Sequence, residues 1–268
     1  MKIFKNIVIW VFIITYMIVV MSFVNEKRNK ILCHDIKVEI LDSLTNGFIK
    51  VSDIEDFFHE TDMNVIGSPV NSINTKDLES KLKKYASVKN AEVYVTLEGD
   101  IRVQIDQRNP ILRVINKRGQ SYYIDQEGTI MPLSSQYSSH VLVANGNIVE
   151  HYEINRTREI FCDNSDANQD ANLGKNHLMC DLYELSKFIY EDDFWRSQIE
   201  QIYVNDEHEF ELIPRVGAHV IYFGSIENYE TKFRNLRAFY LQGLNNVGWN
   251  KYEKISLKFD NQVICTKR

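Results

Sequence analysis

Proline and glycine are scarce in this chain, which holds 4 prolines and 11 glycines in 268 residues. Collagen-like and low-complexity chains need far more of both residues, so those classes are excluded. Cysteine is also rare, and four cysteines cannot build a disulfide-dense scaffold in a chain of this length. Lysine and arginine together number 31 against 37 aspartates and glutamates. Binding of nucleic acid requires clustered basic side chains, so this acidic balance argues against it.

Apolar residues are concentrated at the start of the chain. Residues 7–24 read IVIWVFIITYMIVVMSFV and include no charged side chain. As a helix this run would measure about 27 Å, close to the ~30 Å hydrocarbon core of a bilayer. It lacks the pair of small residues that precedes signal-peptide cleavage. We therefore expect a short cytoplasmic tail at 1–6, a transmembrane helix at 7–24 and a polar linker at 25–32, with the rest of the chain outside the cytoplasmic membrane.

Residues 33–107 have the pattern of a compact α+β module. Alternation of apolar and polar residues at 35–40 predicts a half-buried strand. A capping box of Ser52 and Glu55 predicts the start of a helix, and a second amphipathic helix follows it. Two alternating runs on either side of the turn at 98–100 predict a hairpin. The order β-α-α-β-β is typical of a small sheet covered by its helices.

Residues 108–268 are rich in short strand patterns separated by turns. Amphipathic helical segments interrupt these strands, and the first of them starts near Asp181. A last strand is predicted from Ile255 to Cys265. We therefore expect a mainly β-sheet domain with flanking helices, and an α+β fold class for the chain as a whole.

Cys162 and Cys180 flank a polar stretch at 163–177 that has few large apolar residues. The simpler interpretation is two free thiols on either side of an insertion. In an oxidising exterior the two residues could instead form a disulfide, worth about 3 kcal/mol for a loop of this size. Cys33 and Cys265 have no evident partner in the sequence.

Five segments of the sequence follow the motifs of one known protein family. Residues 87–93 match the family's V-x-x-A-x-V run, 99–105 its G-x-L-x-V-x-V run and 107–111 its E-R-x-P box. Residues 123–128 look like its Y-x-x-D-x-x-G box, and 254–259 are similar to its last strand, I-D-L-R-Y. The order of parts also agrees: a short tail, a single span, a POTRA-type module and a β domain. In its motifs and in this order the chain resembles the FtsQ/DivIB family of cell-division proteins.

The resemblance implies a catalytically inert scaffold at the bacterial division septum. Such proteins hold small single-span coiled-coil proteins of the FtsB/DivIC and FtsL type, and they help to control septal peptidoglycan synthesis. The partner adds a strand beside the last strand of the sheet, a mode called β-augmentation. Carried onto this chain, the partner-binding residues would be Lys258, Phe259, Asp260, Asn261 and Val263. The POTRA-type module would contact other septal membrane proteins.

Five positions depart from the family pattern, and one of them is Glu98, which stands where a proline is common before the hairpin glycine. Gln107 stands where glutamate is usual, and Ser256 stands where an acid is usual. Lys258 replaces an arginine and so loses the planar fork that binds carboxylates. Phe259 replaces a tyrosine and loses a hydroxyl group. The last three changes concern the chemistry of the final strand and not the fold.

Residues that could carry other chemistry do not form a recognisable site. The seven histidines lack metal-ligand spacing, and His208-Glu209 lacks the second histidine of H-E-x-x-H. Residues 134–140 hold four serines and a histidine but no nucleophile elbow, which favours a polar loop. We expect no catalytic residue, metal or cofactor. The alternatives are a POTRA-type adaptor in envelope protein export or assembly and, more remotely, an anchored envelope hydrolase that uses 134–140.

Overall fold

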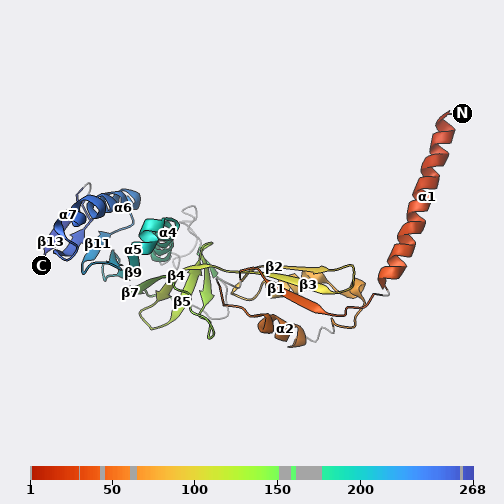
Figure 1. The fold of residues 1–268 in the computed structure, drawn as a ribbon, viewed down its shortest axis with the longest axis horizontal. Coiled ribbons are helices and arrows are strands. Elements are labelled where there is room, and N and C mark those ends of the chain that lie inside the picture. The colour runs from red at the N-terminus through yellow and green to blue at the C-terminus, as the bar shows by residue number, and fades with distance from the viewer. Residues whose placement is uncertain are drawn as a thin grey trace, which may run out of the picture. The chain divides into compact units, whose positions relative to one another are not determined.

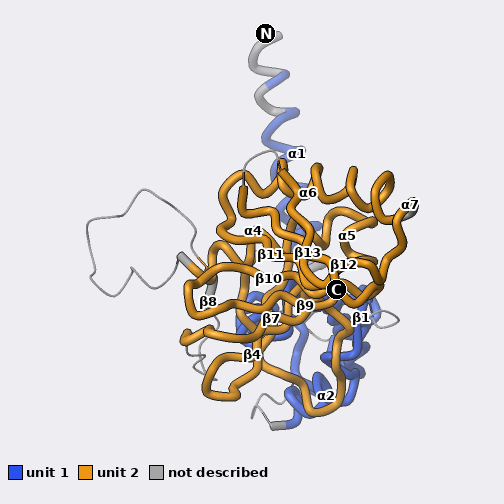
Figure 2. The backbone as a smooth tube through the Cα atoms, turned by 90° about the vertical axis from the view of Figure 1, so that its left-hand side faces the viewer, with its two compact units in different colours: residues 1–107 blue, residues 108–268 orange. Residues whose placement is uncertain are grey.

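The computed structural model describes residues 2–29, 31–42, 46–60, 65–150, 158–160, 177–259 and 262–268. The chain divides into two compact units, residues 1–107 and 108–268 (Figure 2). Each unit has its own sheet and its own helices (Figure 1). The two units are therefore described one at a time.

Helix α1 (Lys2–Asn29) contains the apolar N-terminal run and continues beyond it on both sides. Its large apolar side chains from Ile9 to Met21 are exposed. Among the residues that the structure describes, no helix combines the length and the apolar character needed to cross a membrane. The segment expected at 7–24 is thus helical, but it is not shown to be a membrane span.

The rest of the first unit is a small α+β module that confirms the expected order of elements. It consists of β1 (Ile36–Ile40), α2 (Val51–Glu60), the 3-10 turn η1 (Val70–Ser72), α3 (Thr75–Leu82), β2 (Val88–Val95) and β3 (Ile101–Gln107). β3 lies in the middle of the sheet, parallel to β1 and antiparallel to β2. Its side chains Ile101, Val103 and Ile105 are completely buried. Alternate side chains of a strand point to the same face of the sheet, and helices cover this face.

The second unit is built on one mixed sheet. Its first strands are β4 (Pro110–Ile115), β5 (Ser121–Asp125), β6 (Thr129–Pro132), β7 (Leu142–Gly146) and β8 (Arg158–Glu159). The later strands are β9 (Ile199–Val204), β10 (Phe210–Pro214), β11 (Val220–Gly224), β12 (Tyr252–Ser256) and β13 (Ile264–Lys267). In the described part of this unit the strand order is β13-β12-β11-β10-β9-β7-β4-β5-β6-β8. Because β4, β7 and β9 are parallel, all three begin at the same end of the sheet.

Helices bury one face of this sheet. They are α4 (His177–Glu191), α5 (Asp193–Gln198), α6 (Tyr229–Ala238), the π-helical turn η3 (Phe239–Leu244) and the short α7 (Asn245–Val247). One continuous apolar core joins them to the strands, with members that include Leu182, Trp195 and Phe233 from the helices and Val114, Ala144, Ile202, Phe223 and Ile255 from the sheet. The expected mainly β domain with flanking helices is therefore confirmed.

The predicted last strand from Ile255 to Cys265 is wrong, because the chain reverses within it. β12 and β13 pair antiparallel, with Ile255 opposite Cys265. A turn closes the hairpin, and in it the Gln262 amide donates a 3.3 Å hydrogen bond to the Phe259 carbonyl. β12 therefore lies between β11 and β13, and β13 forms the edge of the sheet.

Candidate protein-binding site

The outer edge of β13 is the first feature of the candidate site. β13 pairs with β12 on one side, and within the described residues no strand pairs with its other side. Unpaired backbone N–H and C=O groups along such an edge can accept a further strand from another chain. The hairpin thus supplies the geometry that strand addition needs.

The side chains of β13 follow the pattern of a half-buried strand. Cys265 is partly buried and packs against the apolar core of the unit. Its neighbours Ile264 and Thr266 are exposed, and the Ile264 side chain is 44% accessible to solvent. Phe259 in the preceding turn is 57% exposed. Phe259 and Ile264 therefore place two exposed apolar side chains at this end of the sheet, where an added strand could cover them.

Lys258, expected to bind a partner, already forms an ion pair within the chain. Its Nζ lies 2.6 Å from a carboxylate oxygen of Glu209 and 4.0 Å from one of Glu207. The hydrogen bond to Glu209 raises the pKa of Lys258, and the same bond lowers the pKa of Glu209. Lys258 therefore fastens the β12–β13 turn to the β9–β10 turn, which is a structural role.

The five residues expected at the binding site are not equivalent. Phe259 is exposed, whereas Val263 is partly buried and packs against the core. Asp260 and Asn261 lie outside the described residues. No observation tests whether any of the five binds a partner, so that assignment stays a prediction.

The expected site omitted the edge strand itself. Ile264, Thr266 and Lys267 belong to β13 and lie along the available edge. Asp260-Asn261 was the signal that could have located it, because aspartate and asparagine favour chain reversal.

Arg108 and Asp125 belong to two of the motifs that resemble FtsQ/DivIB, and both residues have a structural role. Arg108 donates hydrogen bonds to the Asp125 carboxylate at 2.7 Å and to the Thr129 hydroxyl at 3.0 Å. The other carboxylate oxygen of Asp125 accepts the backbone amides of Glu127 and Thr129. The two motifs therefore join the start of β4 to the β5–β6 turn, and the arrangement stabilises the fold of the second unit.

The serines at 134–140 take part in the local structure of their loop. The Ser139 amide donates to the Tyr123 hydroxyl at 3.2 Å, and Ser138 and Tyr123 share a 3.3 Å hydrogen bond. Ser134 accepts the Gln136 amide at 3.2 Å. Within the described residues, no group of three or more His, Cys, Asp or Glu side chains is placed to hold a metal ion.

Cys180 is disulfide-bonded, so its interpretation as a free thiol is wrong. It belongs to α4, while Cys162 lies outside the described residues. The pairing of these two cysteines therefore stays a prediction. Cys33 and Cys265 are free thiols.

Comparison with known proteins identifies both units. Residues 31–106 match the POTRA-like domain, and residues 109–266 match the family described as FtsQ/DivIB, C-terminal related. The fold and the matches together define a two-domain chain of the protein-interaction class, with a POTRA-like module followed by a mixed β-sheet domain. The chain belongs to the FtsQ/DivIB, C-terminal related family. This family is related to FtsQ/DivIB and is not that family itself, which corrects the closer membership suggested by the motifs. No curated protein matches the chain.

Proposed function

We propose that this protein is a non-catalytic scaffold that binds partner proteins by strand addition at the outer edge of β13. The observation that carries the proposal is the outer edge of β13, which pairs with no other described strand, in a domain related to the FtsQ/DivIB C-terminus. Backbone hydrogen bonds would give the affinity. The exposed side chains of Phe259, Ile264 and Thr266 would give the specificity.

The partners that we propose are small single-span division proteins of the FtsB/DivIC and FtsL type, together with other septal membrane proteins. The proposed location is the division septum at the cytoplasmic membrane, with the N-terminus in the cytoplasm and both units outside. The role of the scaffold there would be to help control septal peptidoglycan synthesis. The family of the second unit and the exposed apolar side chains of α1 support this location.

A photo-cross-linking amino acid at Thr266 tests the binding edge in living cells. We expect it to cross-link to an FtsB/DivIC-type partner, because an added strand would run beside β13. The matched control is the same amino acid at Leu97, which is 99% exposed in the first unit. The proposal fails if both positions cross-link equally, or if Thr266 gives no product while the two proteins still co-purify.

A POTRA-type adaptor in envelope protein export or assembly is the second candidate function. It is favoured by the match of residues 31–106 to the POTRA-like domain, which is not tied to cell division. A fluorescent protein fused to the N-terminus leaves the β13 edge unobstructed and separates the two functions. A ring at the septum supports the division scaffold, whereas a uniform peripheral signal supports the adaptor.

A further inference from the structure

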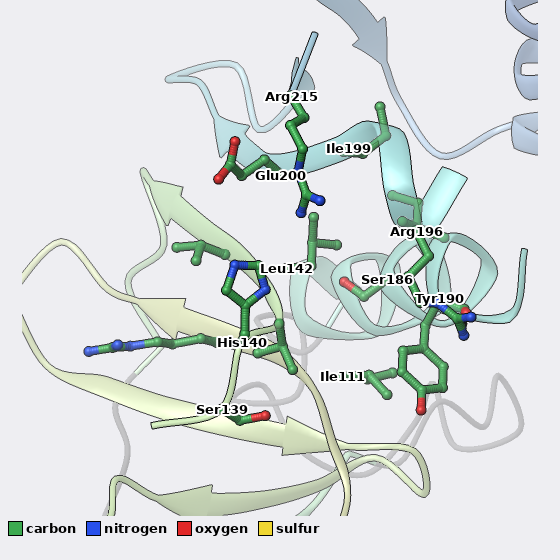
Figure 3. A pocket seen from close by; sticks show the side chains of 14 residues that line it. Ile111, Ser139, His140, Leu142, Ser186, Tyr190, Arg196, Ile199, Glu200 and Arg215 are labelled. Atoms are coloured by element: carbon green, nitrogen blue, oxygen red, sulfur yellow. Dashed lines mark hydrogen bonds between the residues drawn. The ribbon is translucent and has the colours of Figure 1, made fainter. Parts of the chain in front are cut away.

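A cavity of about 240 Å³ lies in the second unit, where the parallel strands β4, β7 and β9 begin. Ile111, Leu142 and Ile199 contribute apolar walls from these strands (Figure 3). Ile189 of α4 also lines the cavity. In the strand order the cavity lies at β9-β7-β4, separated from β13 by β10, β11 and β12. It is therefore a separate location from the proposed strand-addition edge.

Ser186 of α4 brings a polar group into this apolar cavity. Its side chain is completely buried, and its hydroxyl oxygen has no hydrogen-bond partner among the residues that the structure describes. Figure 3 shows the hydroxyl directed towards the space beside Leu142, and both residues line the cavity. A buried hydroxyl without a partner is destabilising, so a ligand atom that accepts its hydrogen bond would bind favourably.

The charged side chains around the cavity are mainly basic. The ionised lining residues are Arg113, Arg196, Arg215 and Glu200, a local net charge of 3 − 1 = +2 in a chain whose net charge is −6. Arg196 is already paired with Asp193. The Arg215 side chain forms no hydrogen bond or ion pair with the described part of the chain. Its guanidinium group extends towards Leu142 (Figure 3), and so it is available to a ligand.

The size of the cavity indicates what can occupy it. Small-molecule sites usually measure about 300–1,000 Å³, so this cavity is better suited to one side chain of a larger ligand. Buried anchor side chains of this kind carry much of the affinity in protein–peptide recognition. Arginines on the rim of such a site typically recognise acidic motifs.

We propose that this cavity binds an acidic peptide segment of a partner protein. An aliphatic side chain of the peptide fills the apolar space, and a neighbouring carboxylate pairs with Arg215. A backbone carbonyl of the peptide accepts the hydrogen bond of the Ser186 hydroxyl. The site would be a second contact with a partner, in addition to the edge of β13, and it does not require strand addition.

A binding assay with the full chain tests the proposal. The probe is a fluorescein-labelled hexapeptide that alternates leucine and glutamate, and binding is followed by fluorescence anisotropy. Arg215→Glu should weaken binding at least about tenfold. The charge-assisted hydrogen bond between the guanidinium group and a peptide carboxylate would be replaced by repulsion between two carboxylates. Arg118→Glu is the matched control, since Arg118 is exposed, does not line the cavity and undergoes the same change of charge. It should leave the affinity unchanged.

Ser186→Ala supplies a second variant that keeps the fold. It removes a buried hydroxyl that has no partner in the described part of the chain, so stability is retained while binding weakens. A peptide that alternates leucine and glutamine should not bind, since it lacks the carboxylates.

The proposal is overturned if the wild-type chain does not bind the acidic peptide, or if Arg215→Glu binds it as well as Arg118→Glu does. Displacement of the peptide by dodecanoate or by inorganic phosphate would assign the cavity to a fatty acid or a small anion instead. Cross-linking at Thr266 reports on the other site, so the two proposals can fail independently.

Discussion

Gln107 ends β3 and is almost completely buried, with 2% of its surface exposed. Its side-chain carbonyl accepts the Ile49 amide at 2.8 Å. Its side-chain NH₂ donates to the Asp42 carboxylate and to the Asn46 carbonyl, both at 3.0 Å. Only an amide can donate and accept in this way, which explains why glutamine stands at a position where the similar motif has glutamate.

Gln107→Glu should therefore destabilise the first unit by at least about 2 kcal/mol. The new carboxylate would face Asp42 and the Asn46 carbonyl, and two hydrogen bonds would be lost. Urea denaturation at neutral pH measures the effect, with the exposed Gln136→Glu as control. The loss of stability should be smaller in acid, where the new glutamate is protonated and uncharged. A variant as stable as the wild type would show that the two donated bonds are unimportant.

His219 couples the stability of the second unit to pH. The ring is buried, and its Nε2 lies 2.9 Å from the Tyr240 hydroxyl. Burial lowers the pKa of His219 below its ordinary value of 6.5, although the Trp249 carbonyl favours the protonated ring. The unfolded chain thus binds the proton more readily than the folded chain does. The stability contributed by the neutral ring is present above pH 6.5 and is lost as the pH falls below that value.

Thermal unfolding measured between pH 7.5 and pH 5 tests this coupling. The melting temperature of the wild type should fall across the range, and His219→Gln should show a smaller fall because glutamine does not titrate. His208→Gln is the control, since His208 is exposed. If His219→Gln loses stability in acid as steeply as the wild type, another group is responsible.

At the scale of elements, Gly146 determines how closely β7 can approach β9. Its φ angle is +106°, and an added Cβ would lie 2.2 Å from the Val204 carbonyl oxygen. Both the backbone conformation and the contact therefore exclude a larger residue.

Gly146→Ala should cost more than the ~1–3 kcal/mol of a strained backbone alone, because a clash with main-chain atoms is added. Gly119→Ala isolates the conformational part, since φ there is +79° but no atom lies within 4 Å of the added Cβ. Chemical denaturation of both variants measures the difference. Equal losses would mean that β9 can move away at little cost.

Element boundaries show where sequence patterns suffice and where they fail. The order of strands and helices in the first unit follows from alternation, because one face of each strand is more buried than the other, fully so in β2 and β3 and only partly in β1. The capping box was wrong in detail: α2 begins at Val51, ahead of Ser52, and it is the Asp53 carboxylate that accepts the Lys50 amide at 2.9 Å. Several polar side chains near a helix start compete for the same amides, so the sequence does not decide among them.

The binding edge and the cavity were less accessible from the sequence. β13 is only four residues long, and its alternation continues that of β12, so the pattern predicts one strand where the chain forms a hairpin. The cavity brings together residues as distant as Ile111, Ser186 and Arg215. They meet where the parallel strands β4, β7 and β9 begin, and no local pattern encodes the pairing of strands so far apart in the chain.

At the scale of the whole molecule, each unit has a core of its own, which predicts that the second unit folds alone. A fragment of residues 106–268 should give a cooperative thermal transition. Arg108→Met in that fragment should cost about 3–5 kcal/mol, because the Asp125 carboxylate is completely buried and would lose its partner. Arg196→Met, which breaks an exposed pair with Asp193, should cost less than about 1 kcal/mol. A fragment without a cooperative transition would mean that the second unit depends on the first.

The parallel arrangement of β4, β7 and β9 also affects how quickly the second unit reaches its native state. Val114, Ala144 and Ile202 lie side by side in the sheet although about 90 residues separate the first from the last. Such pairings require long loops to close before any hydrogen bond forms, so we expect slow folding, in milliseconds to seconds. The cavity at the starts of these strands exists only after the last of them has joined. A ligand for that cavity would therefore distinguish chains that have finished folding from those that are still collapsing.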